Sequence, residues 1–301
     1  MRTDLINHHI ERNSETAGLR DSYRPHRQRV MQLIEATVRD LAGVDDTRTL
    51  SSIVLLGAGN CHDVSLNRLA ELFRRIHLVD VDLSAIGNAS AASGCADEII
   101  ELHGPLDIAE PLMAMTTRDF DSADQSRLTN SLQLLSSPNG VAEVPEADVV
   151  VSLCLFSQMI LSLSALLPQT DAGFATALKA LRVGHMRRMM SMLRPGGVAV
   201  YVTDIVSSET APELRTVSDS ELPELIQKLV SDSNFFSGTS PSPLLTELNL
   251  LSRLPGGPET VDTIDPWKWQ VGERTYAVYA MRIQKKVPLG EEAPAADEDT
   301  D

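Results

Sequence analysis

The stretch SSIVLLGAGNCHD, from Ser51 to Asp63, organises the rest of the chain. Its apolar, β-branched run Ile53–Leu56 is typical of a strand that is buried on both faces. The run ends in Gly57-Ala58-Gly59, and from Val64 onward apolar residues recur at helical spacing. A strand, a glycine turn and a helix N-terminus in this order predict a site for the polar part of a nucleotide-like ligand. Glycines allow close approach to the backbone, and the free amides of a first helical turn point at the ligand.

A second strand is predicted about twenty residues later, the spacing typical of a nucleotide-binding unit. Residues Ile76–Val79 form another short apolar run, and Asp80 follows at once. A carboxylate at this point can accept hydrogen bonds from both hydroxyls of a ribose. The glycine turn and Asp80 together therefore predict a site for a nucleoside cofactor.

Composition places the chain among ordinary globular proteins. Its 301 residues are 43% hydrophobic and 23% charged, which suits one large core. No uninterrupted apolar run approaches the ~18 residues that span a bilayer, and the first residues lack the apolar core of a signal peptide. We therefore expect a cytoplasmic protein with no membrane partner.

Charge and cysteine content exclude further classes. Asp and Glu number 42 against 26 Lys and Arg, so the net charge is −16. Such a surface repels phosphate backbones, and we expect no nucleic-acid partner. Three cysteines, Cys61, Cys95 and Cys154, are odd in number and lack CxxC spacing, so they predict neither a disulfide framework nor a metal site.

Strands and helices alternate along most of the chain. After the first two strands, further strands are predicted at 97–102, 148–152 and 198–202, and a hairpin at 267–271 and 276–283. Helices are predicted at 24–42, 84–93, 111–115, 125–135, 174–193, 222–230 and 244–251. Buried strands that alternate with helices predict a parallel sheet covered on both faces.

Three segments are expected from these patterns. Residues 1–48 form an N-terminal helical cap, 49–287 a cofactor-binding domain, and 288–301 an acidic tail too poor in apolar residues to fold. Within the cap, Tyr23, His26 and Arg27 have two interpretations: a solvated surface, or a cover that closes over the ligand site.

Two classes of enzyme combine a glycine turn with an acid after the second strand. Dinucleotide oxidoreductases place a third glycine three residues after the second, where this chain has His62. They also continue with another βαβ half, whereas this chain ends in a hairpin. The dinucleotide pattern is therefore incomplete.

The ordered motifs resemble those of class I S-adenosylmethionine (SAM)-dependent methyltransferases. They are LLGAGN at the first turn, LVD ending at Asp80, DVVVS from Asp148, and LRPGGVAVY from Leu193. The resemblance covers roughly residues 50–283. It implies a three-layer, Rossmann-like α/β fold with a seven-stranded, mostly parallel sheet that ends in an antiparallel hairpin.

The resemblance also implies a role for individual positions. SAM would be the cofactor and S-adenosylhomocysteine the product. Asp80 would hold the ribose, Asp107 would contact the adenine amino group, and Ser152 and Leu153 would line the methionine end. The full set of expected cofactor contacts is Gly57, Ala58, Gly59, Asn60, Asp63, Asp80, Val81, Asp107, Ser152 and Leu153. Asp63 has a second interpretation, in which it lies in the first helical turn and complements the helix dipole.

The methyl acceptor is expected to be a small molecule, contacted by Phe156, Gln158 and Asp204 near the ends of the fourth and fifth strands. No residue is assigned as a general base. His185, Arg187 and Arg188 are interpreted as the solvated face of a helix, and Trp267 and Trp269 as core. A NAD-dependent oxidoreductase and a non-catalytic, methyltransferase-like binding module are the alternatives.

Overall fold

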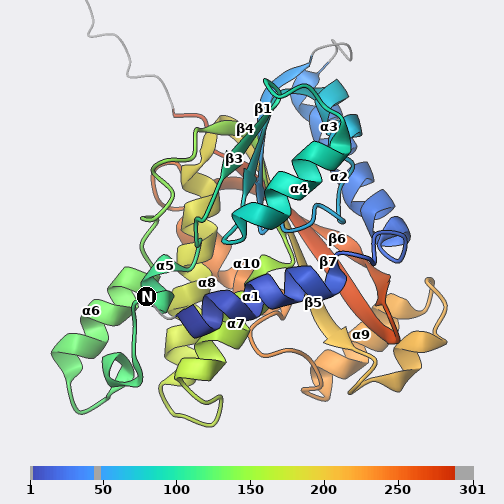
Figure 1. Ribbon diagram of the computed structural model, residues 1–301. Coiled ribbons are helices and arrows are strands. Elements are labelled where there is room, and N and C mark those ends of the chain that lie inside the picture. The colour runs from blue at the N-terminus through green and yellow to red at the C-terminus, as the bar shows by residue number, and fades with distance from the viewer. Residues whose placement is uncertain (1–2, 44–48, 289–301) are drawn as a thin grey trace, which may run out of the picture.

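The computed structural model describes residues 3–43 and 49–288 of the chain (Figure 1). The end of the predicted cap, residues 44–48, and nearly all of the predicted acidic tail lie outside the described residues. Among the residues that are described, no helix is both long and apolar enough to cross a membrane.

The elements alternate as predicted. The strands are β1 (Leu50–Leu56), β2 (Phe73–Val79), β3 (Ile100–His103), β4 (Ala147–Leu153), β5 (Leu193–Ser207), β6 (Pro258–Val271) and β7 (Arg274–Lys285). The α-helices are α1 (Thr3–Thr16), α2 (Arg24–Ala42), α3 (Leu66–Leu72), α4 (Leu83–Ser93), α5 (Glu110–Met113), α6 (Gln125–Leu135), α7 (Leu155–Leu166), α8 (Phe174–Ser191), α9 (Leu222–Ser231) and α10 (Pro241–Leu251). Two 3-10 helices, η1 (Thr117–Phe120) and η2 (Pro212–Arg215), complete the described elements.

All seven strands form one sheet in the order β3-β2-β1-β4-β5-β7-β6. Neighbouring strands from β3 to β5 are parallel, and β7 pairs antiparallel with both β5 and β6. The predicted fold class, with its C-terminal hairpin, is confirmed. The strand order reverses between β1 and β4, and in open α/β sheets ligands bind at such a switch point, beyond the carboxyl ends of the strands.

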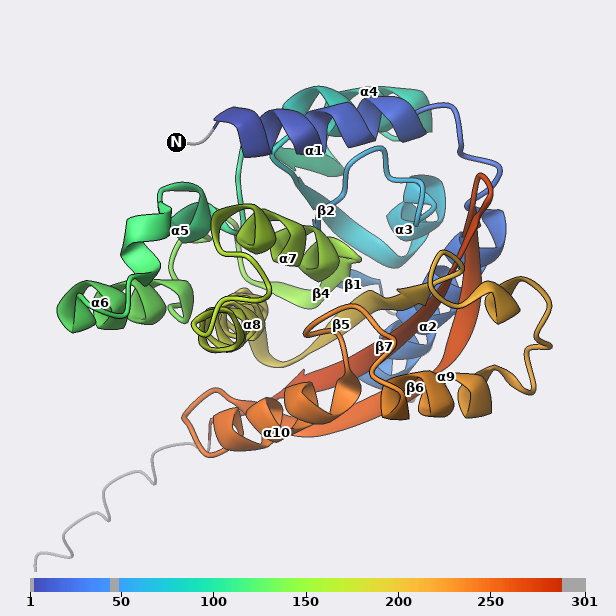
Figure 2. The same ribbon diagram turned by 90° about the horizontal axis from the view of Figure 1, so that it is seen from below.

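Helices cover both faces of the sheet and create two cores (Figure 2). Helices α2, α3 and α4 lie on one face, where Ile34 and Leu69 pack against β1 and β2. Helices α5 to α10 lie on the other, where Leu163 and Leu181 pack against β4 and β5. Strand β1 is fully buried between the two layers at Ile53–Leu56, which explains its wholly apolar sequence.

Helix α2 has the predicted bounds and belongs to one of these two layers. Helix α1, in contrast, lies across α4 at the edge of the sheet (Figure 2). The expected division of the chain at residue 48 stays a prediction.

Helix α7 is an element that sequence analysis missed. It begins two residues after β4 without any polar break, and periodicity alone cannot separate a buried helix from the end of a buried strand. Cys154, between the two, has a positive φ of 49° and turns the chain from strand into helix.

The interpretation of α8 as a helix with a solvated basic face is wrong for His185 and Arg188, because both are fully buried. Arg188 donates to the carbonyl oxygen of Asn139, and Arg187, half-buried, donates to that of Ser136. The loop after α6 packs over α8 and supplies these acceptors. The approach of α6 is so close that a Cβ on Gly184 would meet the carbonyl oxygen of Leu135 at 1.9 Å.

Candidate functional site

The loop after β1 has an alternating backbone conformation. Gly57, Gly59 and Cys61 have positive φ angles of 69°, 45° and 52°. Gly57 and Ala58 donate their amides to the carbonyl oxygen of Val79, the last residue of β2. The glycine loop is therefore held against the end of the neighbouring strand, at the switch point of the sheet.

Asp80 fixes this loop through its carboxylate. Oδ2 accepts the amide of Gly59 at 2.8 Å, and Oδ1 accepts that of Asp82, also at 2.8 Å. The side chain is buried, and desolvation raises its pKa while the two backbone amides act in the opposite direction. A carboxylate has about four lone-pair positions, so Asp80 keeps acceptor capacity beyond these two bonds.

The helix that follows the loop differs from the prediction. It begins at Leu66 rather than Val64, has only seven residues, and ends before Phe73, which begins β2. Its first turn holds no acidic residue, so the placement of Asp63 in that turn is wrong. The glycine loop itself, and not a helix N-terminus, borders the small cavity of the site.

Asp63 instead belongs to a chain of contacts that joins three elements. Its Oδ1 lies 3.0 Å from Nε2 of His26 on α2. The indole N–H of Trp267 on β6 donates to Nδ1 of the same imidazole at 3.1 Å. The indole thus fixes Nδ1 of His26 as an acceptor, while Nε2 of the same ring lies beside the Asp63 carboxylate. These contacts tether the glycine loop to the core.

Helix α1 closes the site from outside. The side-chain amide of Asn60 donates to the carbonyl oxygen of Asn13 at 2.6 Å, and that of Asn13 donates to Oδ2 of Asp82 at 3.3 Å. A Cβ on Gly59 would meet Oδ1 of Asn13 at 2.8 Å. The cavity left between α1 and the glycine loop measures about 100 Å³.

A larger cavity of about 410 Å³ adjoins the first, and Tyr23, Cys154, Gln158 and Trp269 border both. Its aromatic wall consists of Tyr23, Phe235, Phe236, Trp269 and Tyr276. The ring of Trp269 contacts Tyr23 and Tyr276 at centroid distances of 5.2 and 5.3 Å. The core interpretation thus holds for Trp267, which is buried, whereas Trp269 also lines a cavity.

Asp204 supplies a carboxylate to the larger cavity, at a break in the pairing of β5 with β7. The side chain is buried, and its Oδ1 has no hydrogen-bond partner among the described residues. Burial raises the pKa of this carboxyl, and a hydrogen bond with Ser157 partly offsets that effect. A buried acceptor without a partner is expensive, so the position suits a group that pairs with a bound molecule.

The remaining predicted residues separate into two groups. Leu153 borders the small cavity, whereas Ser152 and Phe156 face the opposite core. Ser152 Oγ hydrogen-bonds with Nε2 of His185 at 2.9 Å, and Phe156 stacks on the same imidazole. Neither side chain lines the cavities, so the expected contacts of Ser152 with the cofactor and of Phe156 with the acceptor receive no support from this geometry.

Two further residues that were expected to contact the cofactor, Val81 and Asp107, lie near Asp80. Val81 is half-buried in the turn after Asp80. Asp107 accepts the amide of Ala109 at 2.7 Å, in a loop whose Leu106 amide bonds to the carbonyl oxygen of Asp80. Both remain next to the nucleoside end of the predicted site, although neither borders a described cavity.

The contribution of α1 was not predicted, because its residues Arg12, Asn13 and Thr16 follow no motif. The neighbouring basic stretch that contains Tyr23 and Arg27 was identified from the sequence, and these two residues have different roles. Tyr23 lines both cavities, while Arg27 donates to the carbonyl oxygen of His62 and supports the loop.

The thiols of Cys61 and Cys154 border the site but are buried, which raises both pKa values above the ordinary range. A buried, protonated thiol is a poor nucleophile. Both cysteines therefore act as small buried apolar residues.

No protein-family model matches the sequence, and no curated protein matches it. Among solved structures, the N-methyltransferase NodS from Bradyrhizobium japonicum, in complex with S-adenosyl-L-homocysteine, aligns at 16% identity over 86% of each chain, with a TM-score of 0.40. An O-methyltransferase family protein from Burkholderia thailandensis aligns at 13% identity over 93% of this chain and 63% of its own, with a TM-score of 0.36. A putative RNA methyltransferase from Pyrococcus horikoshii aligns at 11% identity over 84% of each chain, with a TM-score of 0.39.

These likenesses are too distant to transfer a substrate or an activity. The fold class rests on the strand order itself, with β7 inserted antiparallel between β5 and β6. The chain has the Rossmann-like fold of class I methyltransferases.

Proposed function

We propose that the protein is a SAM-dependent methyltransferase that acts on a small-molecule acceptor. One observation carries the proposal: the carboxylate of Asp80 holds the amide of Gly59 at the switch point of the sheet, where Gly59 lines a small cavity that adjoins a larger one with a second buried carboxylate. The first group suits the ribose of a nucleoside, and the second suits an acceptor.

The hydrogen-bonding groups of the site fit SAM, but the small cavity beside the glycine loop is too small to hold it in this arrangement of α1. Asp80 would accept the ribose hydroxyls, and the glycine loop with Leu153 would face the methionine part. Ligand cavities usually measure ≈ 300–1,000 Å³, against about 100 Å³ here. Cofactor binding would therefore require α1 to move away from Gly59 and Asn60.

Bound SAM would supply a methyl group already activated by its sulfonium, so the protein mainly needs to position the acceptor and exclude water. The aromatic wall and Gln158 would orient the acceptor. The partly unpaired carboxylate of Asp204 faces this cavity and would hold or receive an acceptor proton, and burial raises its pKa. A general base, which sequence analysis left unassigned, is thus proposed at Asp204.

The two alternatives from sequence analysis are less well supported. Classic dinucleotide folds have six parallel strands in the order 3-2-1-4-5-6, whereas β7 here is antiparallel. A binding module without catalysis would not need a buried carboxylate in the second cavity. The acidic net charge of −16 disfavours a nucleic-acid acceptor, and a small molecule suits a cavity of about 410 Å³.

Calorimetric titration with SAM, S-adenosylhomocysteine and NADH tests the proposal on the wild type and on Asp80→Asn. We expect micromolar binding of the first two ligands, weakened at least tenfold in the variant, because an amide offers fewer acceptor positions to the ribose. The exposed loop variant Asp97→Asn should bind as the wild type does. At 100 times the dissociation constant, ligand should stabilise the fold by ~2.7 kcal/mol. NADH binding without SAM binding would favour the oxidoreductase.

A further inference from the structure

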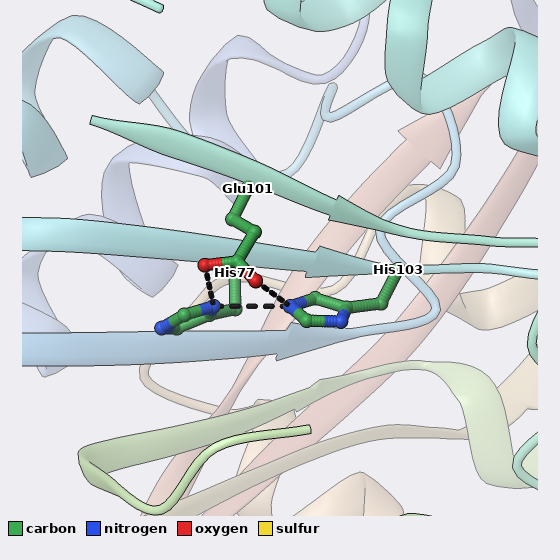
Figure 3. A group of neighbouring side chains, drawn as sticks. All are labelled: His77, Glu101 and His103. Carbon is green, nitrogen blue, oxygen red and sulfur yellow. Dashed lines mark hydrogen bonds and ion pairs between the residues drawn. The ribbon is translucent and has the colours of Figure 1, made fainter. Parts of the chain in front are cut away.

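Strands β2 and β3 bring three potential metal ligands together on one face of the sheet (Figure 3). His77 on β2 is the direct neighbour of Glu101 on β3, and His103 follows two residues later on the same face. Sequence analysis predicted no metal site, because these residues match no ligand motif and 26 positions separate the two histidines.

The three side chains point toward one another. Nδ1 of His77 lies 3.0 Å from Nε2 of His103 and 3.4 Å from Oε2 of Glu101. Nε2 of His103 lies 3.7 Å from Oε1 of the same carboxylate. Tetrahedral Zn²⁺, with ligand bonds of ≈ 2.0–2.2 Å, separates its ligand atoms by about 3.3 Å. The observed spacing brackets this value.

Protons alone do not satisfy the cluster. Only one proton fits between two nitrogens that are 3.0 Å apart, and it leaves the carboxylate at 3.4 Å and 3.7 Å without a well-made bond to either ring. A cation at the centre would pair with all three groups at once.

We propose that His77, Glu101 and His103 bind a divalent transition-metal ion, with Zn²⁺ as the probe. Two imidazoles and one carboxylate favour first-row transition metals over Mg²⁺ and Ca²⁺, which prefer oxygen ligands. The positions of the side chains are set by a paired sheet, so little ordering is needed on binding. Glu101 is about half exposed, which leaves the metal open to solvent and to a further ligand.

The site adjoins the proposed cofactor site but does not depend on it. The carbonyl oxygen of the ligand His103 accepts the amide of Asp80 at 3.2 Å. Of the other charged groups near the imidazoles, Glu143 would favour a cation, while Arg75 and Arg194 would oppose it. A bound ion would join β2 to the short strand β3. His103 pairs in the sheet with Val79, the residue before Asp80.

Calorimetric titration of chelator-treated, tag-free protein with Zn²⁺ tests this proposal. We expect one ion per chain at micromolar or tighter dissociation constant, an increase in melting temperature, and retention of Zn²⁺ in excess Mg²⁺. Glu101→Gln and His103→Gln should each weaken binding at least tenfold and remove the increase in melting temperature. Both side chains lie at the outer edge of the sheet, and Glu101→Gln is not expected to disturb folding.

The variant His8→Gln is the matched control, because it removes an exposed histidine from α1 beside His9. It should bind Zn²⁺ like the wild type. The tetrahedral ligand-field spectrum of Co²⁺ gives a second readout that does not depend on stability. Equal binding by wild type and Glu101→Gln, or loss of binding in His8→Gln, would overturn the proposal.

Discussion

Asp204 carries a buried carboxylate oxygen, Oδ1, that has no hydrogen-bond partner among the described residues. Its neighbours do not fully pair it, and burial raises its pKa. A group whose folded pKa lies above its unfolded value contributes stability at low pH and loses it as the pH rises through the folded pKa. Wild-type protein should therefore lose stability from this residue on going from acid to neutral pH.

We accordingly expect Asp204→Asn to be more stable than the wild type at pH 8, by about 1 kcal/mol, and closer to it at pH 4. Urea unfolding at the two pH values measures the difference. Binding of S-adenosylhomocysteine should be unchanged, whereas methyl transfer should be lost once an acceptor is known. Such a gain in stability with loss of function is typical of active-site residues. A variant less stable than the wild type at pH 8 would show that Asp204 serves the fold.

At the scale of elements, α1 determines access to the site. The Asn60 side chain holds the Asn13 carbonyl oxygen of this helix, and the Asn13 side chain in turn holds Asp82. A typical hydrogen bond contributes about 1 kcal/mol to stability. If the cofactor binds only when α1 is displaced, its apparent association constant is the intrinsic one multiplied by the fraction of molecules that are open.

Removal of the Asn13 side chain should therefore favour the open arrangement. We expect Asn13→Ala to bind S-adenosylhomocysteine about fivefold more tightly than the wild type, chiefly through faster association, since about 1 kcal/mol corresponds to that factor. Stopped-flow fluorescence of Trp269, which lines both cavities, follows the association. Asn7→Ala, exposed on the same helix, should have no effect. Weaker binding by Asn13→Ala would mean that Asn13 contacts the cofactor directly.

For the molecule as a whole, buried histidine makes stability depend on pH. His185 lies on α8 with its imidazole fully buried against β4, and desolvation, reinforced by Arg188, lowers its pKa to about 3. The unfolded chain gains a proton here below about pH 6.5, and the folded protein does not. The contribution of the buried, neutral His185 to stability is therefore fully present above pH 6.5 and is lost as the pH falls toward 3.

Protonation of His185 in the unfolded chain should reduce the free energy of unfolding by about 2 kcal/mol when the pH falls from 7.5 to 5. Chemical denaturation of the wild type and of His185→Gln at the two pH values measures it. The variant should be less stable at pH 7.5, because it loses packing against Phe156, but its stability should fall less on acidification. The exposed-site variant His8→Gln should retain the full pH dependence. An equal decrease in His185→Gln would assign the effect to other groups.

Local sequence patterns determined most of the fold. The apolar runs of β1, β2 and β4, the helical spacing of α2 and α6, and the short turn of the hairpin each specify an element from neighbouring residues alone. The glycine loop and Asp80 were predictable for the same reason, since a turn with positive φ needs glycine and a strand end is marked by its first acid. The boundaries of α3 were misplaced, and that between β4 and α7 was missed because apolar residues continue through both elements.

Contacts between distant segments depended on the tertiary structure. Ser152 lies in β4 and Phe156 in α7, as close to the site in sequence as expected, but the pleat of β4 and the turn of α7 point them into the core beside His185. The position of α1 over Gly59 depends on packing against α4, which no local pattern in residues 3–16 records. The same holds for His77, Glu101 and His103, because the register of β2 on β3 brings them together. Local preferences act between near neighbours, whereas sites formed across strands and layers depend on the packing of the whole chain.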